Sequence, residues 1–139
     1  MKKKIAILGS TGSIGKCLID IIKKDKKNFE ILLLSADVSY KELLKQAKFF
    51  KVKNLIITNK DSFNKLKKDK TCKNIRIYND FNNFRKIFKK KIDYTMCSIL
   101  GIQGLKPTIE IIKYTKKIAI ANKEAIVCGW DLIEKNLRK

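Results

Sequence analysis

Short apolar runs alternate with amphipathic segments along this chain. A run of three or four apolar residues without polar alternation is typical of a strand buried on both faces of a parallel sheet. Such runs, together with two segments that contain polar residues, predict six strands, at residues 5–8, 31–34, 55–57, 75–78, 92–97 and 118–121. Between them, apolar residues recur at the helical spacing of three and four positions. That spacing predicts helices at residues 13–24, 42–50, 61–68 and 82–89, a helix with Pro107 near its start, and a last helix from Asn122 through Leu137.

Six strands that alternate with helices predict an α/β fold. Right-handed crossovers would place helices on both faces of one Rossmann-like, doubly wound parallel sheet. The 139 residues suffice for one domain with its own core, and no linker or repeat divides them. We therefore expect a single domain over residues 1–139, with its ligand across the carboxyl ends of the strands.

The strand at residues 5–8 leads into a turn with three evenly spaced glycines, Gly9, Gly12 and Gly15. Gly9 would allow the tight turn, Gly12 would let a phosphate approach the backbone, and Gly15 would let the next helix lie close to the strand. The N-terminus of that helix attracts anions through its unpaired N–H groups. The turn therefore predicts binding of a dinucleotide pyrophosphate.

Thr11 and Ser13 add hydroxyl groups that can bond phosphate oxygens at the same turn. The spacing Gly-x-x-Gly-x-x-Gly belongs to the wider dinucleotide-binding group. It does not distinguish NAD from NADP.

Three further loops follow predicted strands at the ligand-binding edge of the sheet: residues 35–39, 97–101 and 122–124. The last loop permits two interpretations. Asn122 can cap the final helix with Glu124 in its favourable first turn. Alternatively, Lys123 can meet an anionic substrate or a phosphate.

Composition narrows the classes of function. The net charge of +20 raises the possibility of nucleic-acid binding, yet only three of the 33 basic residues are arginine and the charge is spread over almost every helix. Nucleic-acid binding is therefore the less favoured alternative.

No apolar run reaches eighteen residues, and the run after Met1 is too short for a secretory signal, so we expect a cytoplasmic protein without a membrane span. The four cysteines are scattered and histidine is absent, which predicts buried free thiols and no metal ligands.

Residues 4–15 and 121–127, with the segment 101–108 between them, resemble the N-terminal domain of the 1-deoxy-D-xylulose 5-phosphate reductoisomerase family. The resemblance covers essentially the whole chain. It implies an oxidoreductase that uses NADPH and a divalent metal, Mg²⁺ or Mn²⁺. This enzyme rearranges and reduces a sugar phosphate to 2-C-methyl-D-erythritol 4-phosphate, a precursor of isoprenoids, and as a full-length protein is expected to be a homodimer.

The resemblance also implies roles for individual residues. The cofactor pyrophosphate would be held by four residues of the first turn: Thr11, Gly12, Ser13 and Ile14. Asn122 and Glu124 would contact the nicotinamide side of the cofactor. Lys123 would contact the substrate.

The chain departs from the family pattern after residue 36. The family usually has a basic residue followed by asparagine there, for the 2′-phosphate of NADP, whereas this chain has Val38 and Ser39 beside Asp37. An acidic residue at this point favours a free ribose hydroxyl and repels a 2′-phosphate. Lys41 is the nearby candidate for compensation. NADPH remains the cofactor that the resemblance implies, with Asp37, Val38 and Ser39 at its adenosine ribose.

The family's acidic metal-binding motif, its substrate-closing segments and its C-terminal helices do not occur within these 139 residues. Because the reaction needs the sugar positioned and its carbonyl polarised by metal, we expect a cofactor-binding domain that does not convert the substrate alone and contains no catalytic residue.

A short-chain dehydrogenase is disfavoured, since no tyrosine has a lysine four residues later. A non-catalytic NAD(P) sensor or partner-binding domain remains an alternative.

Overall fold

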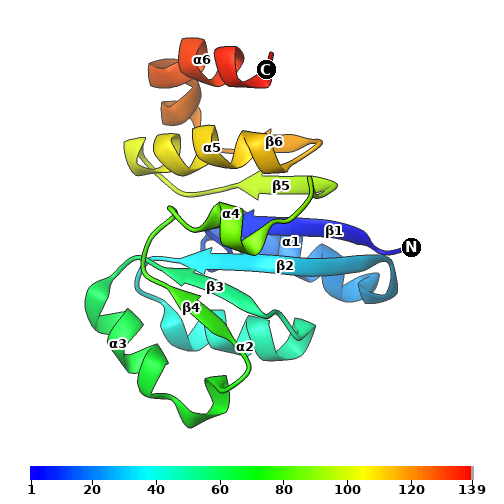
Figure 1. The fold of residues 1–139 in the computed structure, drawn as a ribbon, viewed down its shortest axis with the longest axis vertical. Coiled ribbons are helices and arrows are strands. Elements are labelled where there is room, and N and C mark those ends of the chain that lie inside the picture. Colours follow the sequence, from blue (N-terminus) through cyan, green and yellow to red (C-terminus); the bar gives the residue numbers. More distant parts are fainter. Residues whose placement is uncertain (139) are drawn as a thin grey trace.

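The structure is a computed structural model that describes residues 1–138, and its centre is a six-stranded sheet (Figure 1). The strands are β1 (Lys3–Leu8), β2 (Phe29–Ala36), β3 (Asn54–Ile57), β4 (Arg76–Tyr78), β5 (Tyr94–Cys97) and β6 (Ile118–Ile120). They lie in the order β4-β3-β2-β1-β5-β6, and every neighbouring pair is parallel. This arrangement confirms the predicted doubly wound, Rossmann-like α/β fold.

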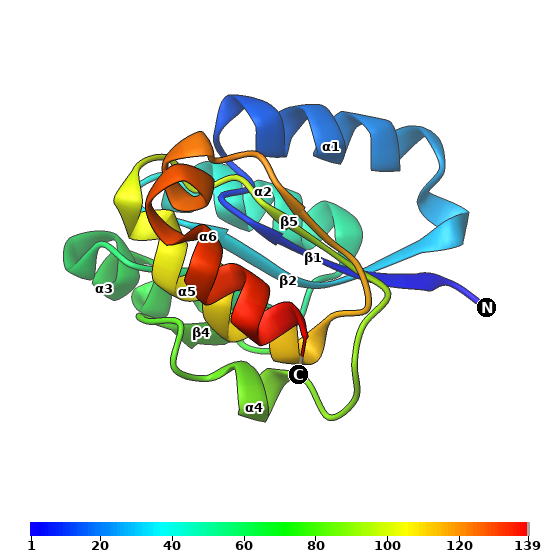
Figure 2. The same ribbon diagram turned by 90° about the horizontal axis from the view of Figure 1, so that it is seen from above.

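The helices cover both faces of the sheet. They are α1 (Ser13–Lys24), α2 (Tyr40–Phe50), α3 (Lys60–Lys68), α4 (Phe84–Ile87), α5 (Leu105–Ile111) and α6 (Lys123–Leu137). Figure 2 shows α1 and α2 on one side of the sheet and α4, α5 and α6 on the other, with α6 alongside α5. Within residues 1–138, no helix is both long and apolar enough to cross a membrane.

The central strand β1 is buried on both faces, as its unbroken apolar run predicts. Ile5 and Ile7 belong to a core cluster shared with α1 and α2. Ala6 and Leu8 belong to a second cluster on the opposite face, shared with α4 and α5. The alternation of side chains along a strand thus divides one apolar run between two cores.

The strand order reverses beside β1. The chain proceeds outward from β1 to β4 and then returns to place β5 against the other side of β1. At such a reversal the connections after the two strands diverge, which opens a crevice at their carboxyl ends. The fold therefore places the glycine turn that follows β1 at the mouth of this crevice.

The helix predicted at residues 82–89 is wrong in its extent, because α4 covers only Phe84–Ile87. Asp80 accepts hydrogen bonds from the Asn82 backbone N–H and the Asn83 side chain, at 2.8 and 3.0 Å, and this local turn competes with helix at residue 82. At the other end Phe88 is extended, and its ring lies 6.0 Å from that of Tyr114. Tertiary packing of aromatic rings thus sets the end of α4.

The buried face of α1 consists of Gly15, Ile19 and Ile22, whereas Ile14, Cys17 and Ile21 are exposed although they are apolar. Gly15 lies on the buried face, and its missing side chain lets the helix approach the turn after β1.

All four cysteines are free, as predicted, but only two are buried. Cys72 and Cys97 lie in the two cores, whereas Cys17 and Cys128 are exposed on α1 and α6. Burial raises the pKa of Cys97 to about 12. Burial is also the main cause of the raised pKa of Cys72. Neither buried thiol therefore forms thiolate readily at neutral pH.

A thiol count tests this distribution. With an aromatic disulfide reagent at about pH 8, we expect Cys17 and Cys128 to react quickly and Cys72 and Cys97 to react only after unfolding in guanidinium chloride. The absorbance of the released thiol measures both phases. Cys17→Ser is the control and should remove one fast equivalent. A third fast thiol in the native wild type would contradict the packing of Cys72 or Cys97.

Candidate functional site

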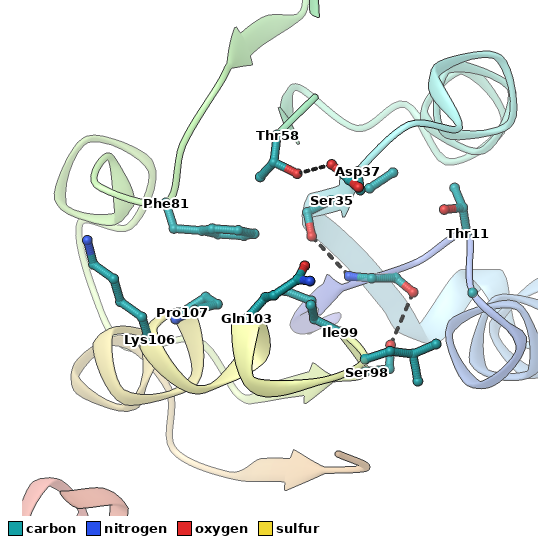
Figure 3. A pocket seen from close by; sticks show the side chains of 14 residues that line it. Thr11, Ser35, Asp37, Thr58, Phe81, Ser98, Ile99, Gln103, Lys106 and Pro107 are labelled. Atoms are coloured by element: carbon teal, nitrogen blue, oxygen red, sulfur yellow. Dashed lines mark hydrogen bonds between the residues drawn. The ribbon is translucent and has the colours of Figure 1, made fainter. Parts of the chain in front are cut away.

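A pocket of about 530 Å³ opens where the glycine turn, the ends of β2 and β3 and the start of α5 meet (Figure 3). It is lined by residues from five segments of the chain: Gly9, Thr11, Gly12, Ser35, Ala36, Asp37, Thr58, Phe81, Ser98, Ile99, Leu100, Gln103, Lys106 and Pro107. The pocket thus occupies the crevice that the reversal of strand order creates.

The turn after β1 approaches its neighbours so closely that it requires glycine. Gly9 has a φ of +84°, and a Cβ there would lie 2.8 Å from the Ser98 carbonyl oxygen. A Cβ on Gly15 would lie 2.2 Å from the Gly9 carbonyl oxygen. Gly12 is different, because the nearest atom to its Cβ would be 3.6 Å away. Gly9 and Gly15 therefore serve the fold, and Gly12 keeps the surface of the turn bare.

Two serines from the flanking strands hold this turn in place. The Gly9 N–H donates to Ser35 Oγ at 2.9 Å, at the end of β2. On the other side, the Ser98 hydroxyl donates to the carbonyl oxygens of Leu8 and Gly9, at 2.9 and 3.1 Å. Gln46 from α2 donates to the Ser10 carbonyl oxygen at 3.1 Å. Three separate elements thus fix the backbone of the turn.

The N-terminus of α1 opens directly from the turn. Its N-cap residue is Gly12, which provides no side-chain cap, and no acidic residue lies in the first turn of the helix. In contrast, Asn59 and Asn122 cap α3 and α6 with their side chains. The uncapped N–H groups and the helix dipole favour an anion at this point, and Thr11 adds a hydroxyl beside it. The arrangement suits a phosphate or a pyrophosphate.

The other half of the pocket is largely apolar and contains one aromatic ring. Figure 3 shows Phe81 on one side and Pro107 and Gln103 from the α5 region on the other, with Ile99 at the base. Apolar walls with an aromatic ring suit a flat heteroaromatic group such as adenine. Lys106 of α5 also lines the pocket and is drawn on the Phe81 side of the view in Figure 3.

Asp37 lies between these two regions, at the end of β2. Its Oδ1 accepts a hydrogen bond from the Thr58 hydroxyl at 2.7 Å. The residue is exposed and lines the pocket. Asp37 and Lys106 are the two charged side chains among the described lining residues.

Asn122 acts as a structural clamp. It is 3% exposed, and its Oδ1 accepts from the Ala125 N–H at 3.1 Å, so the helix-cap interpretation is confirmed. Its side-chain amide donates to the carbonyl oxygens of Ile99 and Gly101, at 2.6 and 2.5 Å. Because this loop lines the pocket, Asn122 positions one wall of the site from behind.

Some of the predicted site residues line the pocket, and the others lie outside its lining. Four line the pocket: Gly9, Thr11, Gly12 and Asp37. Ser13 and Ile14 are exposed at the start of α1, and Gly15 is buried behind the turn. Val38 and Ser39 are exposed just beyond Asp37. Lys123 and Glu124 are exposed in the first turn of α6, after β6, and do not line the pocket.

Several pocket residues were absent from the sequence prediction: Thr58, Phe81, Gln103, Lys106 and Pro107. Thr58 directly follows the predicted third strand, so the rule of carboxyl ends could have found it. Phe81 carried no local signal. Among residues 1–138, no cluster of three cysteine or acidic side chains could hold a metal ion.

Comparisons with known proteins agree on one family. The family model for 1-deoxy-D-xylulose 5-phosphate reductoisomerase matches residues 5–129. The reductoisomerase of Pelagibacter ubique is 57% identical over 141 residues, which cover 99% of this chain and 36% of that protein. That of Wolbachia pipientis from Culex pipiens is 36% identical, over 99% of this chain and 35% of that protein. The chain thus spans about 36% of the length of the first of these relatives.

Solved structures show the same similarity. The reductoisomerase of Zymomonas mobilis in complex with NADPH superposes with a TM-score of 0.89 at 28% identity, over 99% of this chain and 36% of that one. A reductoisomerase in complex with NADPH, fosmidomycin and magnesium superposes with a TM-score of 0.87 at 27% identity, over 98% of this chain and 34% of that one.

The contact between α1 and the glycine turn can be tested by substitution. We expect Gly15→Ala to lower the free energy of unfolding by about 2 kcal/mol or more, because the methyl group would overlap backbone atoms. Gly12→Ala is the matched control and should cost less than about 1 kcal/mol, since its methyl group meets ordinary contacts. Urea denaturation followed by circular dichroism measures both. Equal losses would contradict the close approach at Gly15.

The clamp at Asn122 gives a second test. Asn122→Ala removes the cap of α6 and both hydrogen bonds to the loop, and we expect it to lower the free energy of unfolding by about 2–3 kcal/mol. Asn136→Ala on the same helix is the control. It removes one exposed bond to the Leu132 carbonyl oxygen and should change stability by about 0.5 kcal/mol or less. Similar urea midpoints for the two variants would show that Asn122 does not clamp the loop.

Proposed function

Because this chain belongs to the 1-deoxy-D-xylulose 5-phosphate reductoisomerase family, we propose that it is the NADPH-binding domain of such an enzyme. The observation that carries the proposal is the bare glycine turn, which opens an uncapped helix N-terminus into the pocket. The similarity to a reductoisomerase in complex with NADPH supports this choice of cofactor.

The residues of the pocket fit the parts of a nicotinamide dinucleotide. The pyrophosphate would be held by the turn at Thr11 and Gly12 and by the N-terminus of α1, including Ser13 and Ile14. The adenine would lie against Phe81. The adenosine ribose would lie toward Asp37, with Val38 and Ser39 just beyond it.

The nicotinamide end of the dinucleotide would extend along the turn toward the ends of β5 and β6, where Asn122 and Glu124 lie. When bound, NADPH supplies the hydride for the reduction. The chain's own part is to orient the dinucleotide and to fix the loop between β5 and α5, for which Ser98 and Asn122 provide the hydrogen bonds.

For the whole protein, we propose the family reaction: an NADPH-dependent oxidoreductase that rearranges and reduces 1-deoxy-D-xylulose 5-phosphate to 2-C-methyl-D-erythritol 4-phosphate for isoprenoid biosynthesis. Lys123 would contact the sugar phosphate from the first turn of α6. The divalent metal, Mg²⁺ or Mn²⁺, and the groups that act on the sugar would be provided by parts of the enzyme outside these residues. The 139 residues alone would bind cofactor without turnover.

The exposed surface of α6 supports a place in a larger protein. Val127, Trp130 and Leu132 are apolar and exposed, with Val127 at 81%. Such a surface is typical of an interface. We propose that the remainder of the enzyme covers it. A homodimeric enzyme and a cytoplasmic location are also proposals, and they rest on the family resemblance and on the composition.

A titration with NADPH tests the proposed function. For the wild type we expect saturable quenching of Trp130 fluorescence, or energy transfer from it to the reduced nicotinamide. We expect Gly12→Ala to bind NADPH at least about tenfold more weakly than the wild type, because its methyl group would occupy the space of a phosphate oxygen. The urea transition of Gly12→Ala shows that any loss of affinity is not a loss of fold. If the wild type bound neither NADPH nor NADH, this function would be ruled out.

A further inference from the structure

We infer that Asp37 selects against the 2′-phosphate of NADPH, so that this chain binds NADH at least as tightly as NADPH. The inference rests on the proposed function, because it takes the pocket to hold a nicotinamide dinucleotide. It concerns only the adenosine ribose, where the two cofactors differ.

Asp37 occupies the place where dinucleotide-binding folds contact this ribose, at the carboxyl end of the second strand and about twenty residues after the last glycine. Backbone hydrogen bonding continues past the end of β2 and holds Asp37 in this place. The Thr58 N–H donates to the Ala36 carbonyl oxygen and the Asn59 N–H donates to that of Asp37, both at 3.2 Å. Asp37 is therefore fixed to the sheet rather than carried on a loose loop.

The side chain of Asp37 is prepared to accept a further hydrogen bond. Thr58 donates to Oδ1 at 2.7 Å, which orients the carboxylate and leaves Oδ2 for a ligand. None of the ion pairs within residues 1–138 involves Asp37. An ionised carboxylate is only an acceptor, so it accepts a hydrogen bond from a 2′-hydroxyl and repels a 2′-phosphate.

No neighbouring cation of the described pocket takes over the role of a phosphate clamp. Val38 and Ser39, which follow Asp37, are uncharged. Lys41 in the first turn of α2 is exposed and does not line the pocket. The basic lining residue, Lys106, belongs to α5, and Figure 3 shows it well away from Asp37. Among the described lining residues, the charge at the end of β2 is therefore negative.

The test compares the dissociation constants of NADH and NADPH for the 139-residue chain, by fluorescence titration at fixed ionic strength. For the wild type we expect NADH to bind as tightly as NADPH or more tightly. Asp37→Asn retains an oxygen that can accept from Thr58 but removes the charge. We expect this variant to shift the ratio of the two affinities by about tenfold toward NADPH.

Asp20→Asn is the matched control. It removes the same charge from an exposed aspartate on α1, whose partner is Lys23, and it should leave the ratio unchanged. Competition by ADP and by adenosine 2′,5′-bisphosphate isolates the same difference without the nicotinamide. Both pairs of ligands should report the same direction of preference.

The outcomes separate this inference from the proposed function. Binding of NADPH about tenfold or more tightly than NADH by the wild type would overturn the inference and leave the proposed function standing. An unchanged ratio in Asp37→Asn would overturn it as well. The wild-type ratio decides the matter even if the variant fails to fold. Absence of binding for both cofactors would overturn the proposed function and the inference with it.

Discussion

The close approach of α1 to the turn after β1 is the contact on which the rest of the site depends. Gly15 lies so near the Gly9 carbonyl that no side chain fits between helix and turn. This proximity places the N-terminus of α1 at the mouth of the crevice beside β1. The same face of the helix buries Ile19 and Ile22. One steric condition thus determines both the packing of the helix on the core and the position of the partial positive charge that an anion would meet.

The hydrogen bonds around the turn explain how a bare backbone can be kept in one conformation. A glycine-rich segment loses more conformational entropy on folding than any other, so it needs anchors. Here the anchors are Ser35 from β2, Ser98 directly after β5 and Gln46 from α2. All three are buried polar side chains directed at main-chain atoms of the turn. The site is therefore preorganised by the sheet itself, and Asn122 extends the same principle to the next loop, where it holds the backbone at Ile99 and Gly101.

How far the sequence predicts this protein depends on the range of the interactions involved. The strands and the glycine turn were predicted correctly, and the cap at Asn122 was one of two interpretations, because their signals lie within a few neighbouring residues. The extent of α4 was not, because its end depends on packing of Phe88 against Tyr114, which is distant in sequence. Phe81 was missed for the same reason: only the fold brings it opposite Pro107. Cys17 is exposed because the buried face of α1 is formed by Gly15, Ile19 and Ile22.

The large positive charge and the single carboxylate at Asp37 act over different distances, and our inference on the choice of cofactor depends on this difference. The charge of +20 is spread over the surface, where ionic strength of about 0.15 M screens interactions beyond about 8 Å. It can raise the affinity for any polyanion, and it acts on NADPH more than on NADH because the 2′-phosphate adds about two negative charges, but screening weakens it with distance. In the proposed pose, Asp37 lies at the one position where the cofactors differ, and Thr58 donates a hydrogen bond to its carboxylate. A local charge at the point of difference therefore outweighs many distant ones in discrimination, even where it contributes little to total affinity.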